Sequence, residues 1–427
     1  MYGENYNSLN FIIGSENKIE ERENEMISRI HYIVVFAIIY VLFSLILFIF
    51  AKSNVRLTFN GVYKENFNYS VREYIIIFII VFIASIKMNF GSDYWSYSVI
   101  YNKALELYSS VSDIISSRGG LIGSGLYVMA FLMKSFTQYI GWNSALENNL
   151  IFIVVSIFST CIVFRQIRKN SFSFEWSVTT YFFMGYFMIA NNILKQQVAM
   201  SLMMVAYDCL EEKKYVRYII ICFGACLFHS TALVPSILFP IIRLVKFNDK
   251  VVKVISGICI GIMALLPYSI RFFSNITSLF DAKYIDNFTS YSNSTIGRIY
   301  VIGSLVVYIY IFSICYKNRE YMLGKYDKTI SYLSLLAVGI FINFISINFW
   351  LAIRISLYFY QFVIFALPNF IEKSNMSRVV KRNIKILLLI FCVFYVFFSW
   401  DNHYFGFHTI WSDMKPAYLP NYISKYE

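Results

Sequence analysis

The chain has 427 residues and a formal net charge of +12, and 58% of it is hydrophobic while only 15% is charged. A soluble domain of this size is nearly half apolar and about a quarter charged, so the composition excludes a water-soluble globular protein. Predominantly apolar runs recur along the whole length, each of the roughly 17 to 25 residues that cross a bilayer as a helix. The sequence therefore predicts an all-α, polytopic integral membrane protein.

The predicted elements begin with a polar, acidic segment over residues 1–31, which lacks the basic start of a signal peptide. About twelve transmembrane helices are predicted to follow within one domain over 32–400, near 32–51, 73–90, 148–165, 175–190, 197–210, 217–229, 231–245, 251–267, 298–315, 329–347, 352–370 and 384–400. Segment 121–142 is apolar but contains glycines, Lys134 and Gln138, and we expect it to be re-entrant or interfacial. Segments 91–147 and 268–297 are expected outside the membrane, as is the tail 401–427.

Lysine and arginine concentrate in connections that this topology places on one side. Most of the 37 Lys and Arg residues lie around 52–72, 165–169, 213–217, 243–253, 317–328 and 373–385. Short loops rich in these residues face the cytoplasm, so the sequence predicts a multi-pass membrane protein with both termini extracytoplasmic. No basic soluble domain accompanies the charge, so no nucleic-acid partner is expected.

A smaller set of polar residues falls on the predicted outer face. Basic residues are disfavoured there, and an anionic ligand is the economical explanation for them. The set comprises Lys87, "GSDYWSYSVIY" at 91–101, Arg118, the cluster 191–197, His229, Arg271, Lys283, Arg298 and Arg354.

Four members of this outer set carry candidate chemistry. Lys195 is predicted near a helix N-terminus, which favours phosphate, although a snorkelling lysine would explain it too. Arg354 lies about a turn inside a span, and a charge costs roughly 2.5 to 3.5 kcal/mol at the centre of a span, so it should face the interior and have a partner. His229 is either a helix-turn residue bonded to a carbonyl or part of a site. Asp93 is a carboxylate that can accept a proton from a sugar hydroxyl, beside tyrosines that also suit an aromatic belt.

Several sequence motifs are absent. There is no HExxH, no P-loop and no DxD, and the seven cysteines show neither zinc spacing nor a disulfide framework. We therefore expect no metal and no cofactor.

The motifs occur in the order "GSDYWSY", "NNILKQQVA", "EEKKYVRY", "FHSTAL" and "RISLYFYQF". This series resembles the EpsG-type membrane proteins, a branch of the Wzy-like polymerases that make bacterial O-antigen, capsule or exopolysaccharide. The resemblance covers about residues 30–370 and is strongest from Asp93 to His229. Lys195 stands where the family usually has arginine, and "GSGLY" replaces an acidic "EPGF"-like sequence.

The resemblance implies transfer of a glycan from a polyprenyl diphosphate carrier, such as undecaprenyl diphosphate, to another lipid-linked repeat unit at the outer face. Lys195, Arg354 and Arg298 would bind the diphosphate, and Asp93 or His229 would remove the proton from the acceptor hydroxyl. The residues expected to bind substrate or shape the site are Asn192, Gln196, Tyr94, Tyr97 and Tyr358. The expected partners are the lipid-linked oligosaccharide, the lipid bilayer and a chain-length regulator protein.

Two other functions stay open at this point. An O-antigen ligase, or another outer-face transferase in lipopolysaccharide biosynthesis, would be expected to have a larger external domain. A flippase or transporter of the same lipid-linked sugars would be expected to place charges near the membrane midplane in broken helices and to show an internal repeat. In a deletion strain, a single repeat unit on lipid A would indicate a polymerase, whereas unlinked polymer on the carrier would indicate a ligase.

Overall fold

The computed structural model describes residues 38–44, 46, 71–88, 91, 93–244, 295–347, 351–398 and 408–409. Within these ranges the chain is helical apart from two short antiparallel strands, β1 (Lys87–Met88) and β2 (His408–Thr409), which confirms the all-α prediction. The predicted segments 1–31, 251–267 and 401–407, most of 32–51 and most of 268–297 lie outside the described residues, as does 410–427.

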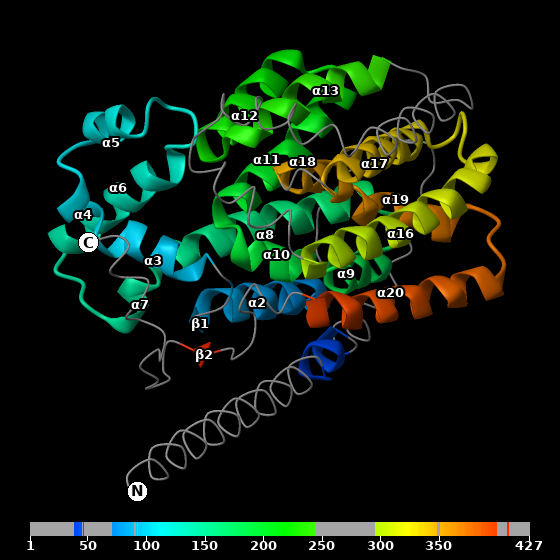
Figure 1. Cartoon of the computed structure of the whole chain (residues 1–427), viewed down its shortest axis with the longest axis horizontal. Helices are drawn as coiled ribbons and strands as arrows, with labels where there is room; N and C mark the ends of the chain where they lie inside the picture. Colours follow the sequence, from blue (N-terminus) through cyan, green and yellow to red (C-terminus); the bar gives the residue numbers. More distant parts are fainter. Residues whose placement is uncertain are drawn as a thin grey trace, which may run out of the picture.

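The helices of the first half of the chain are α2 (Val71–Ile86), α3 (Tyr94–Asn102), α4 (Ala104–Leu107), α5 (Val111–Ser117), α6 (Gly125–Tyr139), α7 (Ala145–Asn148), α8 (Leu150–Asn170), α9 (Phe174–Phe183), α10 (Tyr186–Asn192) and α11 (Leu194–Glu211). Those of the second half are α12 (Tyr215–Phe228), η1 (Ser230–Ala232), α13 (Leu233–Leu244), α16 (Thr295–Lys317), η2 (Arg319–Tyr321), α17 (Asp327–Ile345), α18 (Leu351–Tyr360), α19 (Val363–Lys373) and α20 (Arg378–Phe398). Figure 1 shows the long helices lying beside one another, with α3 to α7 gathered at one end of the molecule.

Four stretches of the described chain are long and apolar enough to cross a membrane: Leu150–Asn170, Ile299–Lys317, Asp327–Ile345 and Ala352–Lys373. Helix α8 illustrates why. Its 21 residues rise about 32 Å, which matches a hydrocarbon core of roughly 30 Å. Arg168 and Lys169 close its last turn, where cations complement the helix dipole. The molecule is therefore a membrane protein, and the predicted number of spans stays a prediction.

One predicted span, 175–190, is two helices in the structure. Helices α9 and α10 are separated at Met184 and Gly185, and Gly185 has a φ of +75°, a conformation that glycine adopts without strain. A Cβ at this position would lie 2.8 Å from the ring of Tyr395. Close packing against α20 therefore accompanies a break that a continuous apolar run does not reveal.

Segment 121–142 forms α6, which has 15 residues and a length of about 22 Å, short of the roughly 30 Å needed to span. It packs against α3, α4, α5 and α12. We refer to residues 93–148, which contain α3 to α7, as the α3–α7 unit. This unit begins with Asp93. It contacts the end of α12 that leads to His229, where the Gly123 N–H donates to the Cys226 carbonyl at 3.0 Å.

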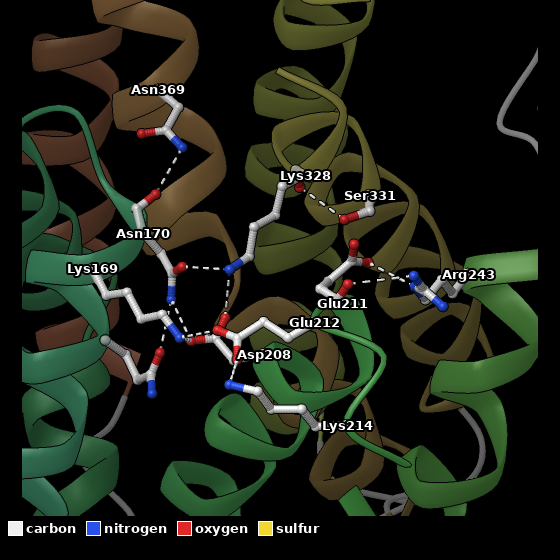
Figure 2. Close-up of polar contacts among 11 residues, drawn as sticks. Lys169, Asn170, Asp208, Glu211, Glu212, Lys214, Arg243, Lys328, Ser331 and Asn369 are labelled. Carbon is white, nitrogen blue, oxygen red and sulfur yellow. Dashed lines mark hydrogen bonds and ion pairs between the residues drawn. The ribbon is translucent and has the colours of Figure 1, made fainter. Parts of the chain in front are cut away.

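Residues of three predicted basic connections meet where α8 and α11 end and α17 begins, which we call the ionic end (Figure 2). Asp208, which is 3% exposed, contacts Lys169 at 2.9 Å and Lys328 at 2.7 Å. Glu212 contacts Lys169 and Lys214, each at 2.6 Å. These lysines come from three different predicted basic connections, so the structure joins loops that the charge pattern assigned to one side.

Helix α11 connects the ionic end to the predicted outer residues. Lys195 is the second residue of α11, and Asp208 lies 13 residues further along it, about 20 Å away at 1.5 Å per residue. Lys195 and Asp208 therefore lie near opposite ends of one helix, and the sidedness predicted from the charge pattern stays a prediction.

Candidate functional site

The turn before α3 places Asp93 against the end of α10. The Asp93 N–H donates to Asn192 Oδ1 at 3.1 Å. Gly91 makes this approach possible, because it has a φ of +90° and a Cβ there would lie 2.5 Å from the same Asn192 oxygen. Glycine at 91 and asparagine at 192 thus fix the backbone of Asp93 at the end of α10.

We expect Gly91→Ala to lower activity by about 10-fold or more, because it adds strain at a positive φ and pushes Asn192 away from Asp93. The measurement is activity per folded protein. Gly324→Ala is the matched control, since Gly324 has a φ of +72° but no heavy atom lies within 4 Å of the position that a Cβ would take there. Equal rates for the two variants would contradict this role of Gly91.

Arg354 meets Asp93 from the opposite side. Its Nη2 lies 3.9 Å from Asp93 Oδ2, and the two side chains are 30% and 32% exposed. The Arg354 backbone carbonyl accepts a hydrogen bond from Gln196 Nε2. Gln196 is fully buried, and its Oε1 has no hydrogen-bond partner among the described residues. The partner that the sequence required for Arg354 is therefore Asp93, in a long and partly exposed contact.

Lys195 lies in the first turn of α11 and contacts the α3–α7 unit. Its Nζ is 5.0 Å from the centre of the Tyr127 ring, and the Arg118 guanidinium is 4.2 Å from the same ring. Burial, followed by the Asp93 carboxylate, raises the pKa of the Tyr97 hydroxyl, which lies near the Lys195 backbone. Tyr97 therefore remains a neutral group packed between the acid and the lysine.

His229 occupies the turn between α12 and η1 and has extended backbone angles. Its Nδ1 lies 2.6 Å from Thr231 Oγ1, which donates to the Tyr358 hydroxyl at 3.3 Å. Burial, followed by the charges of Arg354 and Lys195, lowers the pKa of the imidazole to about 3. The same two cations thus act on His229 and on the rest of the site.

A pH dependence follows for His229. Its folded-state pKa of about 3 lies below the ordinary value of about 6.5, so the unfolded chain binds a proton first as the pH falls. Its contribution to stability is complete above pH 6.5 and is lost between pH 6.5 and pH 3. We expect the Tm of the wild-type protein to fall more steeply than that of His229→Gln from pH 7 to pH 4. Parallel curves would contradict a neutral, buried His229.

The structure thus brings together Asp93, Lys195, His229 and Arg354, with Asn192, Gln196, Tyr97 and Tyr358 around them. Tyr94 does not join them, because its hydroxyl donates to Asn149 at 3.2 Å and its ring stacks on Phe152 at 4.5 Å. Arg298 lies on α16, but its side chain is outside the described part of the structure. Tyr94 is therefore a packing residue between α3 and α8.

Lys87 differs from its prediction. The sequence counted it among the cations that need an anionic ligand, but it is fully buried and donates to the Asn191 carbonyl and Oδ1 at 2.9 and 2.8 Å. The prediction was wrong because backbone and amide oxygens satisfy this lysine inside the protein.

The sequence did not point to Tyr127 or Thr231. Tyr127 lies in an apolar stretch without a charged neighbour, and Thr231 became informative only through its contacts with His229 and Tyr358. Arg118 belonged to the outer set, but nothing in the sequence placed it beside the same ring as Lys195. Each of these contacts joins segments far apart in the chain or depends on side-chain direction.

The site combines the cations Lys195 and Arg354, the carboxylate of Asp93 and a neutral imidazole. Arg354 can donate in a fork to phosphoryl oxygens, and Asp93 can accept a proton. Within the described ranges, no three His, Cys, Asp or Glu side chains come together as a metal site would require. The arrangement suits an anion held beside a proton acceptor.

The fold and the site define a helical membrane protein with a cationic polar site at one end of its bundle, away from the ionic end. Residues 73–411 match the EpsG family, so the chain belongs to the EpsG family, which confirms the resemblance seen in the sequence. The protein is accordingly a membrane protein of polysaccharide biosynthesis. No curated protein and no solved structure shows significant similarity to the chain.

Proposed function

We propose that the protein is a membrane glycosyltransferase that polymerises polyprenyl-diphosphate-linked oligosaccharide repeat units at the outer face of the bacterial inner membrane. The observation that carries this proposal is the meeting of Asp93, Lys195 and Arg354 at the end of α11 opposite the basic loops. A lipid carrier would bring its diphosphate to this level of the membrane.

In this reaction the bond between the anomeric carbon of the donor glycan and its diphosphate oxygen breaks, and a bond to the acceptor hydroxyl forms. The polyprenyl diphosphate leaves with additional negative charge. Lys195 and Arg354 would hold that charge, and fixed cations stabilise a developing anion more than the ground state. The diphosphate supplies the activation, so the reaction needs no nucleotide or redox cofactor.

The acceptor hydroxyl must also lose its proton. Asp93 has a side chain that is 32% exposed, whereas His229 is 9% exposed and its Nδ1 is engaged with Thr231. Accessibility therefore favours Asp93 as the general base, since a base must reach the hydroxyl. His229 would act as a neutral hydrogen-bonding group beside the two cations.

The test is reconstitution of the purified protein in vesicles with a polyprenyl-diphosphate-linked repeat unit. Polymerisation predicts a ladder of products that grows by one repeat unit and stays on the carrier. Transfer only to added lipid A would indicate a ligase, and movement across the bilayer without a new bond would indicate a flippase; either result would overturn the proposal. Lys214→Ala, at the exposed rim of the ionic end, is the control that should retain the ladder.

A further inference from the structure

Lys87 is a buried lysine without an acidic partner in the described part of the chain. Its side chain is 0% exposed, and Nζ donates to the Asn191 carbonyl and to Asn191 Oδ1. The remaining side of the amine faces the Phe152 ring, whose centre is 5.4 Å away. No Asp or Glu within the described ranges lies at ion-pair distance from it.

Such a lysine is costly to fold. An ammonium loses its hydration on burial, and a neutral amine must first give up its proton, so either form opposes folding. A methionine of similar length would fill the same space without that desolvation cost, although it would leave the two Asn191 oxygens without this donor. These two effects oppose each other, so the stability of the fold alone does not require a lysine at this position.

The contacts of Lys87 lead to Asp93 by two routes. Through its side chain, Lys87 donates to Asn191. The next residue, Asn192, accepts a hydrogen bond from the Asp93 N–H at its own Oδ1. Through its backbone, the Lys87 carbonyl accepts from Asn149 Nδ2 at 3.2 Å. The Asn149 Oδ1 in turn accepts from the hydroxyl of Tyr94, the residue after Asp93.

We propose that Lys87 is a positioning residue for the proposed reaction. By fixing Asn191 it keeps the end of α10 in place, so that Asn192 holds Asp93 where the carboxylate reaches the acceptor hydroxyl. The cost of burying Lys87 is offset by an ordered site and not by a more stable fold. This inference rests on the proposed function of Asp93 and Arg354.

The test is Lys87→Met in the purified, reconstituted protein. We expect the Tm to change little, because the relieved desolvation and the lost hydrogen bonds oppose each other, and kcat to fall about 10-fold or more through loss of alignment. KM for the lipid-linked donor should also change little, since Lys195 and Arg354 still bind the diphosphate. An unchanged kcat, or a kcat that falls together with the Tm, would overturn the inference.

Lys134→Met is the matched control. Lys134 pairs with Glu147 at 2.9 Å in the α3–α7 unit, and it has no part in the proposed site. We expect this variant to lower the Tm while the folded fraction keeps its kcat, which is the reverse of the pattern for Lys87→Met. The same pattern in both variants would assign Lys87 an ordinary structural role.

A double-mutant cycle identifies the route of the effect. If Lys87 acts through Asn192, then Lys87→Met combined with Asn192→Ala should lose no more activity than the more damaging single change. Multiplicative losses would overturn that route. The variants Asp93→Asn and Arg354→Ala separate the two proposals. If both variants keep wild-type turnover, the proposed function is wrong. If both are inactive while Lys87→Met is fully active, only the role of Lys87 is wrong.

Discussion

Replacing Arg354 by alanine is expected to lower the rate of polymer formation by about 100-fold or more. The guanidinium lies beside the Asp93 carboxylate, 3.9 Å away. Among the described residues of the site, only Arg354 and the peripheral Arg118 can donate two parallel hydrogen bonds to one anion. In the proposed reaction a leaving diphosphate gains negative charge as the glycosidic bond breaks, so we expect loss of this cation to remove stabilisation that is strongest in the transition state. The measurement is turnover per folded protein in vesicles.

Two further variants sharpen this prediction. Arg354→Lys keeps the charge but loses the forked geometry, so we expect a rate between those of the wild type and Arg354→Ala. Lys195→Arg should be tolerated if the residue binds phosphate. Full activity of Arg354→Ala at normal abundance would show that the arginine only neutralises Asp93 and does not serve the reaction.

The meeting of Asp93 with Arg354 shows what sequence reasoning can reach. A charge within an apolar segment has a high cost, so the sequence alone required Arg354 to face the interior and to have a partner. The position of Lys195 at a helix start followed from a polar cluster between two apolar runs. Both inferences use local patterns and the energetics of burial, and neither identifies which residue lies opposite.

Other contacts of the site depend on the tertiary structure. Asn192 accepts from the backbone of Asp93, 99 residues away in the chain, and no periodicity predicts such a pair. The sequence led us to expect an anionic ligand for Lys87. Its actual partners, the oxygens of Asn191, lie 104 residues further along the chain, where the sequence could not reveal them. Gly185 reads as part of a continuous apolar run, although its contact with Tyr395 and its positive φ accompany a helix break. Long-range packing decides each of these cases.

The second large effect is expected at the ionic end, where Asp208→Ala should destabilise the folded protein by on the order of 3 to 5 kcal/mol. Asp208 is 3% exposed and accepts from Lys169 and Lys328, which come from α8 and α17. Removing the carboxylate would take away the acid that two partly buried lysines share, and of the two only Lys169 would keep an acidic partner, Glu212, within the described residues (Figure 2). The measurement is the Tm of the purified protein, together with its abundance in the membrane.

A combined variant distinguishes the charge from the packing at this position. Replacing a buried ionic cluster as a whole by apolar residues is often neutral, whereas removing one partner is costly. Asp208→Leu with Lys169→Met and Lys328→Met should therefore recover much of the Tm that Asp208→Ala loses. Turnover per folded protein should stay near the wild-type value in the combined variant, because Asp208 lies about 20 Å along α11 from Lys195. A combined variant as unstable as Asp208→Ala would mean that the shape of the aspartate, and not unpaired charge, sets the stability of this end.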